Sequence, residues 1–325
     1  SLYNNEPARW IPANITVNGA AGELRLHVGG PGAFTAEQAG TMLRNLTTSV
    51  NQNGLLAGAT FGVHTTGASN AQELSVNIED SKGPGGGSIH LKKCGAGTLK
   101  LSGANTYSGQ TIVTGGTISV ASLNRVVNGA PSSSLGAPKT DADGEIMISG
   151  GSTLAYTGKG ETTDRTLNLP GGGDTITLEQ SGTGLLKLTS PFVMSGYGEN
   201  KTIILAGSSA GTGELAFNID NVYDRKGEAV TAITKTGTGT WTLSGTNTYT
   251  GPTTVKQGTL LLPNIHSLGD KTEVSLMEGG MLDLTFQGEM RIGKLFLDGK
   301  VQAPGTYNAE SLPKFFRGKG TLKIQ

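Results

Sequence analysis

Two stretches of the chain repeat each other. Residues 93–120 read KCGAGTLKLSGANTYSGQTIVTGGTISV, residues 235–262 read KTGTGTWTLSGTNTYTGPTTVKQGTLLL, and 15 of the 28 aligned positions are identical. Such a repeat constrains the fold strongly, because a short unit cannot bury its apolar side alone and must stack on its neighbours. The repeat therefore predicts a fold built from stacked, similar layers.

Each copy is consistent with three short strands separated by glycine corners. Polar and apolar residues alternate in TLKL at 98–101 and in TWTL at 240–243, as they do in a half-buried strand. A second strand follows in which Val113 or Val255 points inward, and a Gly-Thr corner leads into the third strand. This pattern is typical of one to two turns of a β-helix.

The composition agrees with many tight turns. Glycine makes up 52 of the 325 residues, about twice its average usage, and supplies the positive φ angles that tight turns need. Apolar residues form 35% of the chain and the net charge is zero, which excludes a highly charged disordered chain. A chain without net charge also has no overall electrostatic attraction for nucleic acid. No apolar stretch is long enough for a membrane helix, so we expect no direct membrane insertion by this chain.

One segment departs from the strand pattern. Thr35 and Gln38 predict a capping box, and apolar residues then recur at helical spacing as far as Val50. We therefore predict an amphipathic helix at about 35–50, interrupted by Gly40. Our interpretation is that it covers an open end or flank of the stacked strands, because bare strand edges associate with other chains. A partner-binding helix is the alternative.

We predict an all-β fold, namely a right-handed parallel β-helix (solenoid) with one short amphipathic helix near the N-terminus. It would form a single elongated domain over residues 1–325. Residues 1–92 would hold the N-terminal coils and the helix, residues 93–262 the repeat-bearing coils, and residues 263–325 the C-terminal coils and a cap.

The two copies resemble the autotransporter-associated β-strand repeat, also called the passenger-associated transport repeat. The residues that carry this resemblance include Lys93 and Lys235, the Asn-Thr-Tyr triplets at 105–107 and 247–249, and the glycines around them. The resemblance implies a right-handed parallel β-helix, a secreted or outer-membrane-associated cell-surface location in a Gram-negative bacterium, and a role as a stalk or passenger. It brings no catalytic residues. It also leads us to expect a membrane barrel, and none follows Gln325 in this sequence.

Residues with catalytic potential lack catalytic surroundings. Cys94 stands where the second copy has Thr236, which favours a small structural residue over a nucleophile. The glycine-rich stretches at 83–88 and 170–174 lack the spacing of a phosphate-binding loop and indicate corners. None of the histidines lies in a G-x-S-x-G or H-E-x-x-H motif: His27, His64, His90 and His266. We expect no enzyme activity and no cofactor.

Three acidic residues are the metal candidates of this sequence. Asp141, Asp143 and Glu145 place carboxylates on alternate residues, as at the start of a calcium-binding loop. A complete EF-hand loop needs a bidentate Glu at its twelfth position, where this chain has Ser152. An exposed acidic turn is the interpretation that we favour over a calcium site.

Two further features bear on polymer binding or cleavage. Polysaccharide hydrolysis needs two carboxyl groups about 5–10 Å apart, and Asp220, Asp224 and Arg225 form the best local cluster, although a solvated lateral loop explains them as well. Tyr107 and Tyr249 occupy equivalent repeat positions. We expect them to stack along the solenoid rather than to hold a sugar, which would need an exposed aromatic face.

The last 35 residues are basic and contain aromatic residues. Residues 291–325 carry seven Lys or Arg against two acids, with Phe315-Phe316-Arg317 among them. A patch of this kind can bind anionic polymers. We favour a capping element whose lysines reach out to solvent.

We predict a non-catalytic structural or display segment of an exported bacterial surface protein, of the autotransporter passenger or stalk type. An adhesin or glycan-binding module is the first alternative, and a polysaccharide-degrading β-helix enzyme is the second. The expected partners are host or environmental glycans or other surface proteins, and not nucleic acid.

Overall fold

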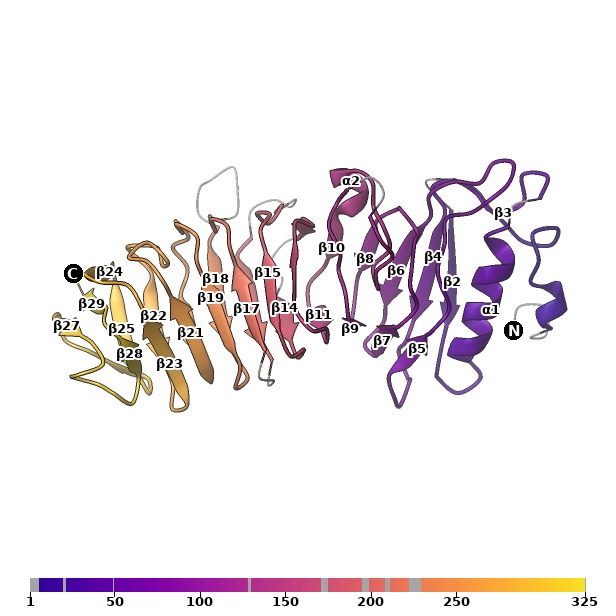
Figure 1. Ribbon diagram of the computed structural model, residues 1–325. Coiled ribbons are helices and arrows are strands. Elements are labelled where there is room, and N and C mark those ends of the chain that lie inside the picture. Colours follow the sequence, from indigo (N-terminus) through magenta and orange to yellow (C-terminus); the bar gives the residue numbers. More distant parts are fainter. Residues whose placement is uncertain are drawn as a thin grey trace. The chain divides into compact units, whose positions relative to one another are not determined.

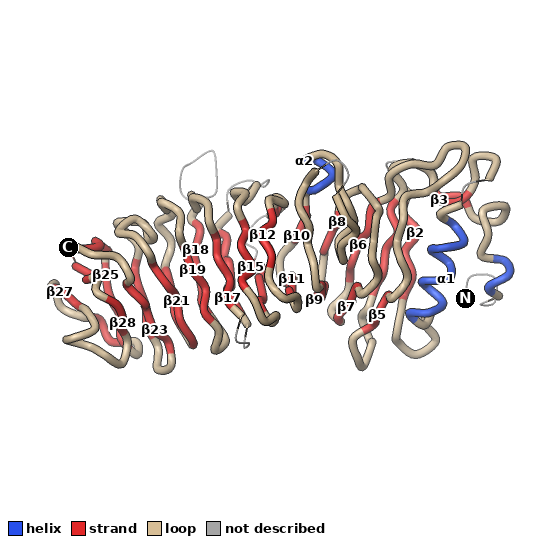
Figure 2. The backbone as a smooth tube through the Cα atoms, viewed as in Figure 1, coloured by secondary structure: helices blue, strands red, loops and turns tan. Residues whose placement is uncertain are grey.

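The regular secondary structure of the chain is mostly β-strand, with few helices, and loops join the short strands (Figure 2). The computed structural model describes residues 6–19, 22–48, 50–127, 130–170, 175–194, 199–207, 211–221 and 229–324. It divides the chain into two compact units: unit 1 comprises Ser1–Ala155 and Thr163–Asn168, and unit 2 comprises Tyr156–Thr162 and Leu169–Gln325. The all-β prediction is confirmed.

The elements of unit 1 are, in chain order, η2 (Pro7–Arg9), β1 (Thr16–Val17), β2 (Glu23–His27), α1 (Ala36–Leu46), β3 (Gly54–Leu55), β4 (Thr60–His64), β5 (Gln72–Leu74), β6 (His90–Cys94), β7 (Thr98–Leu101), β8 (Thr111–Val113), β9 (Thr117–Val120), α2 (Asp141–Gly144), β10 (Ile146–Ile148) and β13 (Leu167–Asn168). Two strands include residues of both units: β11 (Thr153–Tyr156) and β12 (Glu161–Thr163).

The elements of unit 2 are β14 (Thr175–Gln180), β15 (Leu185–Leu188), β16 (Lys201–Ala206), β17 (Thr212–Leu215), β18 (Thr231–Lys235), β19 (Thr240–Leu243), β20 (Thr253–Val255), β21 (Gly258–Leu262), β22 (Glu273–Leu276), β23 (Gly280–Leu284), β24 (Glu289–Ile292), β25 (Lys294–Leu297), β26 (Lys300–Val301), β27 (Thr306–Tyr307), β28 (Phe316–Gly318) and β29 (Thr321–Ile324).

In unit 1, the chain alternates between two parallel sheets from β4 to β10 (Figure 1). The even-numbered strands β2, β4, β6, β8 and β10, followed by β13, form one sheet, and β5, β7 and β9 pair in the other. Parallel neighbours cannot be joined by a tight hairpin, so each connection must cross to the other sheet and return. Within this range, each strand therefore pairs with the second strand after it along the chain, and not with the next strand.

Unit 2 follows the same rule from β14 to β23. The strands β14, β16, β18, β20, β22 and β25 form one parallel sheet, and β15, β17, β19, β21, β23 and β28 form the other. The pattern ends in two short antiparallel pairs, β26 on β25 and β27 on β29. Antiparallel edge strands of two residues offer little backbone for further pairing, which is how natural sheets limit edge-to-edge association.

The core of unit 2 consists of ladders of residues at the same register position. One ladder runs through Ile203, Ile233, Thr253, Val274 and Leu295, and none of these residues is exposed to solvent. Because side chains alternate between the two faces of a strand, every second residue enters such a ladder. Burial of each aliphatic side chain contributes about 1.5–3 kcal/mol.

The three strands predicted in each copy are confirmed, as β7, β8 and β9 in the first copy and as β19, β20 and β21 in the second, and one further strand that the sequence analysis missed runs into the start of each copy and makes four. The missed strand ends at the repeat's own lysine or just after it: β6 ends at Cys94 and β18 at Lys235. In both copies the first strand pairs with the third and the second with the fourth, and the register advances by the same spacing, from Leu91 to Thr111 and from Ile233 to Thr253. The two copies therefore share the same strand pairing and the same spacing between paired strands.

The predicted helix is confirmed as α1, which is shorter than expected. Thr35 caps it, and the capping box with Gln38 is complete. The helix ends at Leu46, and the carbonyl of the next residue, Thr47, accepts a hydrogen bond from the backbone N–H of Lys82 (2.8 Å). Its apolar face is buried and packs near β5, and Gly40 allows close approach, since a Cβ there would lie 2.8 Å from Val76.

Candidate functional site in the polar interior of the repeats

A buried lysine occupies the same position in each repeat. Lys93 lies in a ladder between Val63 and Val113, and Lys235 lies between Leu205 and Val255, with neither side chain exposed. A lysine inside an apolar ladder needs acceptors for all three of its N–H groups, because an unpaired buried charge is very costly.

Backbone carbonyls of the glycine corners supply those acceptors. Lys93 Nζ donates to the carbonyls of Cys94 (3.1 Å), Gly95 (2.6 Å) and Gly115 (2.8 Å). Lys235 Nζ donates to the equivalent carbonyls of Thr236, Gly237 and Gln257, at 2.6, 2.7 and 3.1 Å. Burial lowers the pKa of each lysine to about 8. Each ammonium thus ties the corner that follows its own strand to the corner that follows the neighbouring strand of the same sheet.

A buried asparagine joins three successive segments in each copy. Asn105 Oδ1 accepts from the N–H of Ile78 (2.8 Å), and its Nδ2 donates to the carbonyl of Ser134 (2.7 Å). Asn247 repeats this bridge with Ile219 (2.8 Å) and Ser267 (2.6 Å). An amide can donate and accept at once, so it satisfies the segment before and the segment after it.

The repeat tyrosines are structural as well. Tyr107 and Tyr249 are fully buried, and their hydroxyl groups lie 2.7 Å and 2.8 Å from Oγ1 of Thr111 and of Thr253. Burial raises the pKa of Tyr107 to about 12. Neither ring offers an exposed face, so these tyrosines do not form a sugar platform.

Sequence comparison missed a corner that precedes each repeat. Asn-Ile-Glu-Asp at 77–80 and Asn-Ile-Asp-Asn at 218–221 make matching contacts with the repeat: Asn77 Oδ1 accepts from the N–H of Ala104 (2.9 Å), and Asn218 Oδ1 accepts from that of Thr246 (2.8 Å). We call these two segments the upstream corners. The similarity of the two corners is hard to recognise in the sequence, because the number of residues from the corner asparagine to the repeat lysine differs by one between the copies (77 to 93 and 218 to 235).

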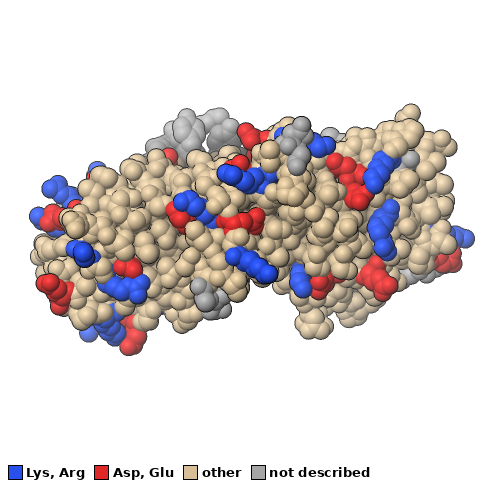
Figure 3. All heavy atoms as spheres, in the orientation of Figure 1, with Lys and Arg blue, Asp and Glu red and all other residues tan. Residues whose placement is uncertain are grey.

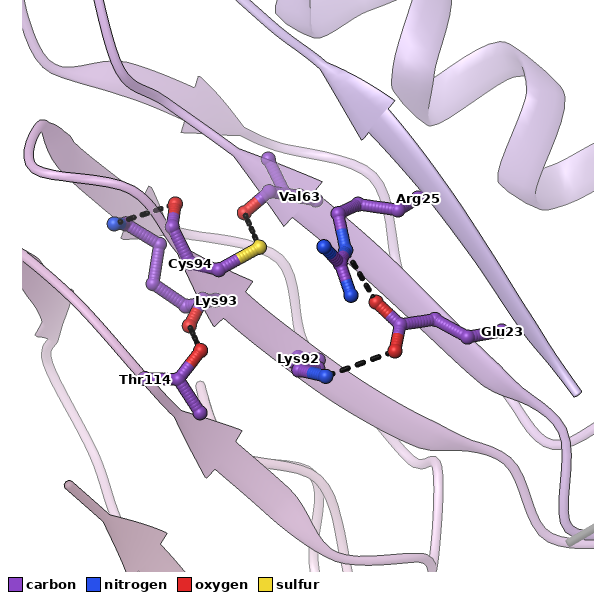
Figure 4. A network of polar contacts seen from close by, with 7 residues as sticks. All are labelled: Glu23, Arg25, Val63, Lys92, Lys93, Cys94 and Thr114. Atoms are coloured by element: carbon purple, nitrogen blue, oxygen red, sulfur yellow. Dashed lines mark hydrogen bonds and ion pairs between the residues drawn. The ribbon is translucent and has the colours of Figure 1, made fainter. Parts of the chain in front are cut away.

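Cys94 and the histidines lie in structural surroundings. Cys94 is buried, its Sγ lies 3.7 Å from the carbonyl oxygen of Val63, and burial raises its thiol pKa, which disfavours the reactive thiolate (Figure 4). On the same face of β6 as Cys94, Lys92 pairs with Glu23 (2.8 Å), which also contacts Arg25. His27 and His64 form an edge-to-face pair with ring centroids 5.2 Å apart.

The calcium candidates do not converge. Thr140 caps α2 and donates to Asp143 Oδ2 (2.8 Å), while Glu145 Oε1 accepts from Asn168 Nδ2 (2.8 Å). Asp141 is exposed on the first turn of the same short helix. Within the part of the chain that the structure describes, no group of three or more His, Cys, Asp or Glu side chains is placed to hold a metal ion.

Of the predicted carboxylate cluster, only Asp220 can be placed, since Asp224 and Arg225 lie outside the described residues. Asp220 is exposed on the second upstream corner, and its Oδ1 accepts a hydrogen bond from the Thr248 hydroxyl. It lines a groove of about 230 Å³ with Phe192 and Asn218.

The basic C-terminal tail is paired and packed. Phe315 and Phe316 are buried, and Arg317 donates to Asp283 Oδ2 with Nη2 at 2.6 Å and Nε at 3.0 Å. Lys314 pairs with Glu278 (3.0 Å). On the face drawn in Figure 3, cationic and anionic residues are interspersed. This arrangement fits a capping element better than a patch for anionic polymers.

The glycine-rich stretches and the helices add no further site. Gly83 and Gly85 both adopt positive φ, as corner residues do, and residues 171–174 of the second stretch lie outside the described residues. Among the helices of the described residues, none has the length and apolar character to span a bilayer.

Comparison with known proteins gives a family and a relative. Residues 91–120 and 233–262 each match the model of the passenger-associated-transport-repeat family. The chain is also 34% identical, over 164 residues that make up 50% of its length, to the adhesin BmaC autotransporter of Brucella suis biovar 1 (strain 1330). The aligned part is 5% of that much longer protein, and no solved structure matches the chain. The chain therefore contains two copies of the passenger-associated transport repeat.

Proposed function

We propose that this chain is a non-catalytic stalk segment in the passenger of a surface protein of a Gram-negative bacterium. The observation that carries the proposal is the use of the repeat's polar side chains. The lysine and asparagine of each copy are buried and bonded to neighbouring turns, and the tyrosine is buried and bonded to the threonine four residues later, so these side chains maintain the fold and offer no reactive group to solvent. A protein whose repeated residues all serve stacking is suited to act as a spacer.

The fold that goes with this function is a right-handed parallel β-solenoid, continuous over the chain. Alternation between two parallel sheets within each unit, from β4 to β10 and from β14 to β23, supports it, since each pair of strands then amounts to one turn. Parallel crossover connections are right-handed in about 98% of cases, which supports the handedness. An experimental structure with left-handed crossovers, or with two separate sandwiches, would contradict this proposal.

Surface exposure of the natural protein is the decisive measurement. Antibodies against the purified chain are applied to intact and to permeabilised cells of the source bacterium, before and after external protease, with a periplasmic protein as the control. We expect intact cells to be labelled and protease to remove the label. Labelling only after permeabilisation would contradict a surface stalk, and product release from a panel of polysaccharides, esters and peptides would contradict the non-catalytic assignment.

A second candidate function is binding of glycans as part of an adhesin. Two observations favour it: the relative that matches half of the chain is named an adhesin, and an exposed groove adjoins Asp220. A glycan array probed with the purified chain tests this function, and binding to no glycan would remove it.

A further inference from the structure

The two upstream corners occupy equivalent places, and each borders a groove. In both, the isoleucine N–H bonds to the repeat asparagine, and the isoleucine carbonyl accepts from the repeat tyrosine N–H (3.1 Å for Ile78, 3.2 Å for Ile219). The next residue, Glu79 or Asp220, then presents a carboxylate to the groove. One scaffold therefore displays an acid at the same position in both units.

The opposite walls of the two grooves differ. In unit 1 the groove measures about 540 Å³, and its other wall comes from the end of α1 and the residues after it, with Arg44, Thr47 and Thr48. In unit 2 that wall is apolar and is formed by Pro191, Phe192 and Met194. The ring of Phe192 packs edge-to-face on Phe217, with centroids 4.8 Å apart, so its orientation is fixed before any ligand arrives.

The groove of unit 2 combines an aromatic ring with polar groups that make no hydrogen bond to the described part of the chain. Asp220 uses one carboxylate oxygen to accept from Thr248, and Asn218 uses its Oδ1 to accept from Thr246. Among the described residues, the second oxygen of Asp220 and the amide nitrogen of Asn218 have no partner. These two groups are one acceptor and one donor, and both side chains are exposed.

We propose that this groove binds a neutral sugar ring. A pyranose has an apolar face, which Phe192 can cover, and hydroxyl groups, which can donate to Asp220 and accept from Asn218. The volume of about 230 Å³ lies below the roughly 300–1,000 Å³ of pockets for drug-sized ligands, and therefore suits one ring or the end of a short glycan. An anionic sugar would be repelled by Asp220. The inference rests on the second candidate function and supplies its ligand class and its residues.

The groove of unit 1 is the internal control. It has the same corner and carboxylate, but Glu79 pairs with Lys82, and no aromatic residue is among the described residues that line it. We expect no comparable affinity for neutral sugars there. The substitution Glu79→Ala therefore removes the equivalent acid without affecting the proposed site.

The test measures binding of the full-length chain to an immobilised panel of neutral oligosaccharides that end in glucose, galactose, mannose, fucose or N-acetylhexosamine. The variants are Phe192→Leu, which keeps apolar packing but removes the flat ring, and Asp220→Ala, with Glu79→Ala as the control. We expect binding to weaken about fivefold in the first and about tenfold or more in the second, and to be unchanged in the control. Unchanged melting temperatures exclude misfolding as the cause.

The outcomes separate the site from the function. Binding that survives both unit 2 variants would overturn this site while leaving glycan recognition intact elsewhere on the chain. Binding to no neutral glycan would overturn the site and the second candidate function together, and it would leave the stalk function untouched. Selective binding of anionic glycans would also overturn the proposal, because it contradicts the charge of Asp220.

Discussion

Substitution of Asn247 by alanine should destabilise unit 2 far more than loss of one polar side chain usually does. Asn247 is buried, and its amide satisfies the N–H of Ile219 and the carbonyl of Ser267. Alanine can do neither, so two buried backbone groups lose their partners. Each unsatisfied group costs about 1–3 kcal/mol, and we expect a loss of about 2–5 kcal/mol in the free energy of unfolding. That is a large fraction of the stability of an ordinary domain, about 5–15 kcal/mol.

Urea unfolding of the full chain measures this loss. Trp241 is the one tryptophan in the sequence of unit 2, so its fluorescence in a Trp10→Phe background reports on that unit. Asn218→Ala is the matched control, because Asn218 also bonds to a backbone N–H but is exposed, so water can replace it. We expect the control to cost less than about 1 kcal/mol. If Asn247→Ala costs no more than Asn218→Ala, the bridging role assigned to the repeat asparagine is wrong.

Three other predictions follow from the same structure. Gly245→Ala should cost at least about 2 kcal/mol, because its Cβ would lie 1.9 Å from the carbonyl oxygen of Phe217, whereas Gly305→Ala, with nothing closer than 3.9 Å, should be nearly neutral in thermal unfolding. Stability should rise between pH 8 and pH 9.5, because burial depresses the pKa of Lys235 to about 8 in the folded chain, while the unfolded chain keeps its proton up to about pH 10.5. The free energy of unfolding should rise by at most about 2 kcal/mol per lysine over this range, and the rise should be smaller in Lys235→Met. The measurement stays below pH 10, because tyrosines of the unfolded chain begin to ionise there and reverse the trend. Millimolar calcium should leave the melting temperature unchanged, since Asp143 and Glu145 bond to Thr140 and Asn168; a rise abolished by Asp143→Ala would restore the calcium site.

The sequence by itself determined the features that depend on near neighbours. Alternation at 98–101 and 240–243 predicted strands β7 and β19, with Leu99, Leu101, Trp241 and Leu243 buried as expected. The helix was predicted because Thr35 and Gln38 contact each other within a single turn. Strand period and capping are local properties, and so they can be recognised in a short window of sequence.

Only the tertiary structure decided what the polar residues of the repeat do. Lysine and asparagine are mostly exposed in proteins, yet Lys93, Lys235, Asn105 and Asn247 are buried. Their partners include backbone groups 20 or more residues away in the sequence, which only the tertiary structure brings near. The groove beside Asp220 was likewise beyond prediction, since Phe192 and Asn218 are distant in sequence. Every residue carries a backbone carbonyl, so the amino-acid sequence does not show which carbonyls accept the hydrogen bonds of the buried lysines and asparagines.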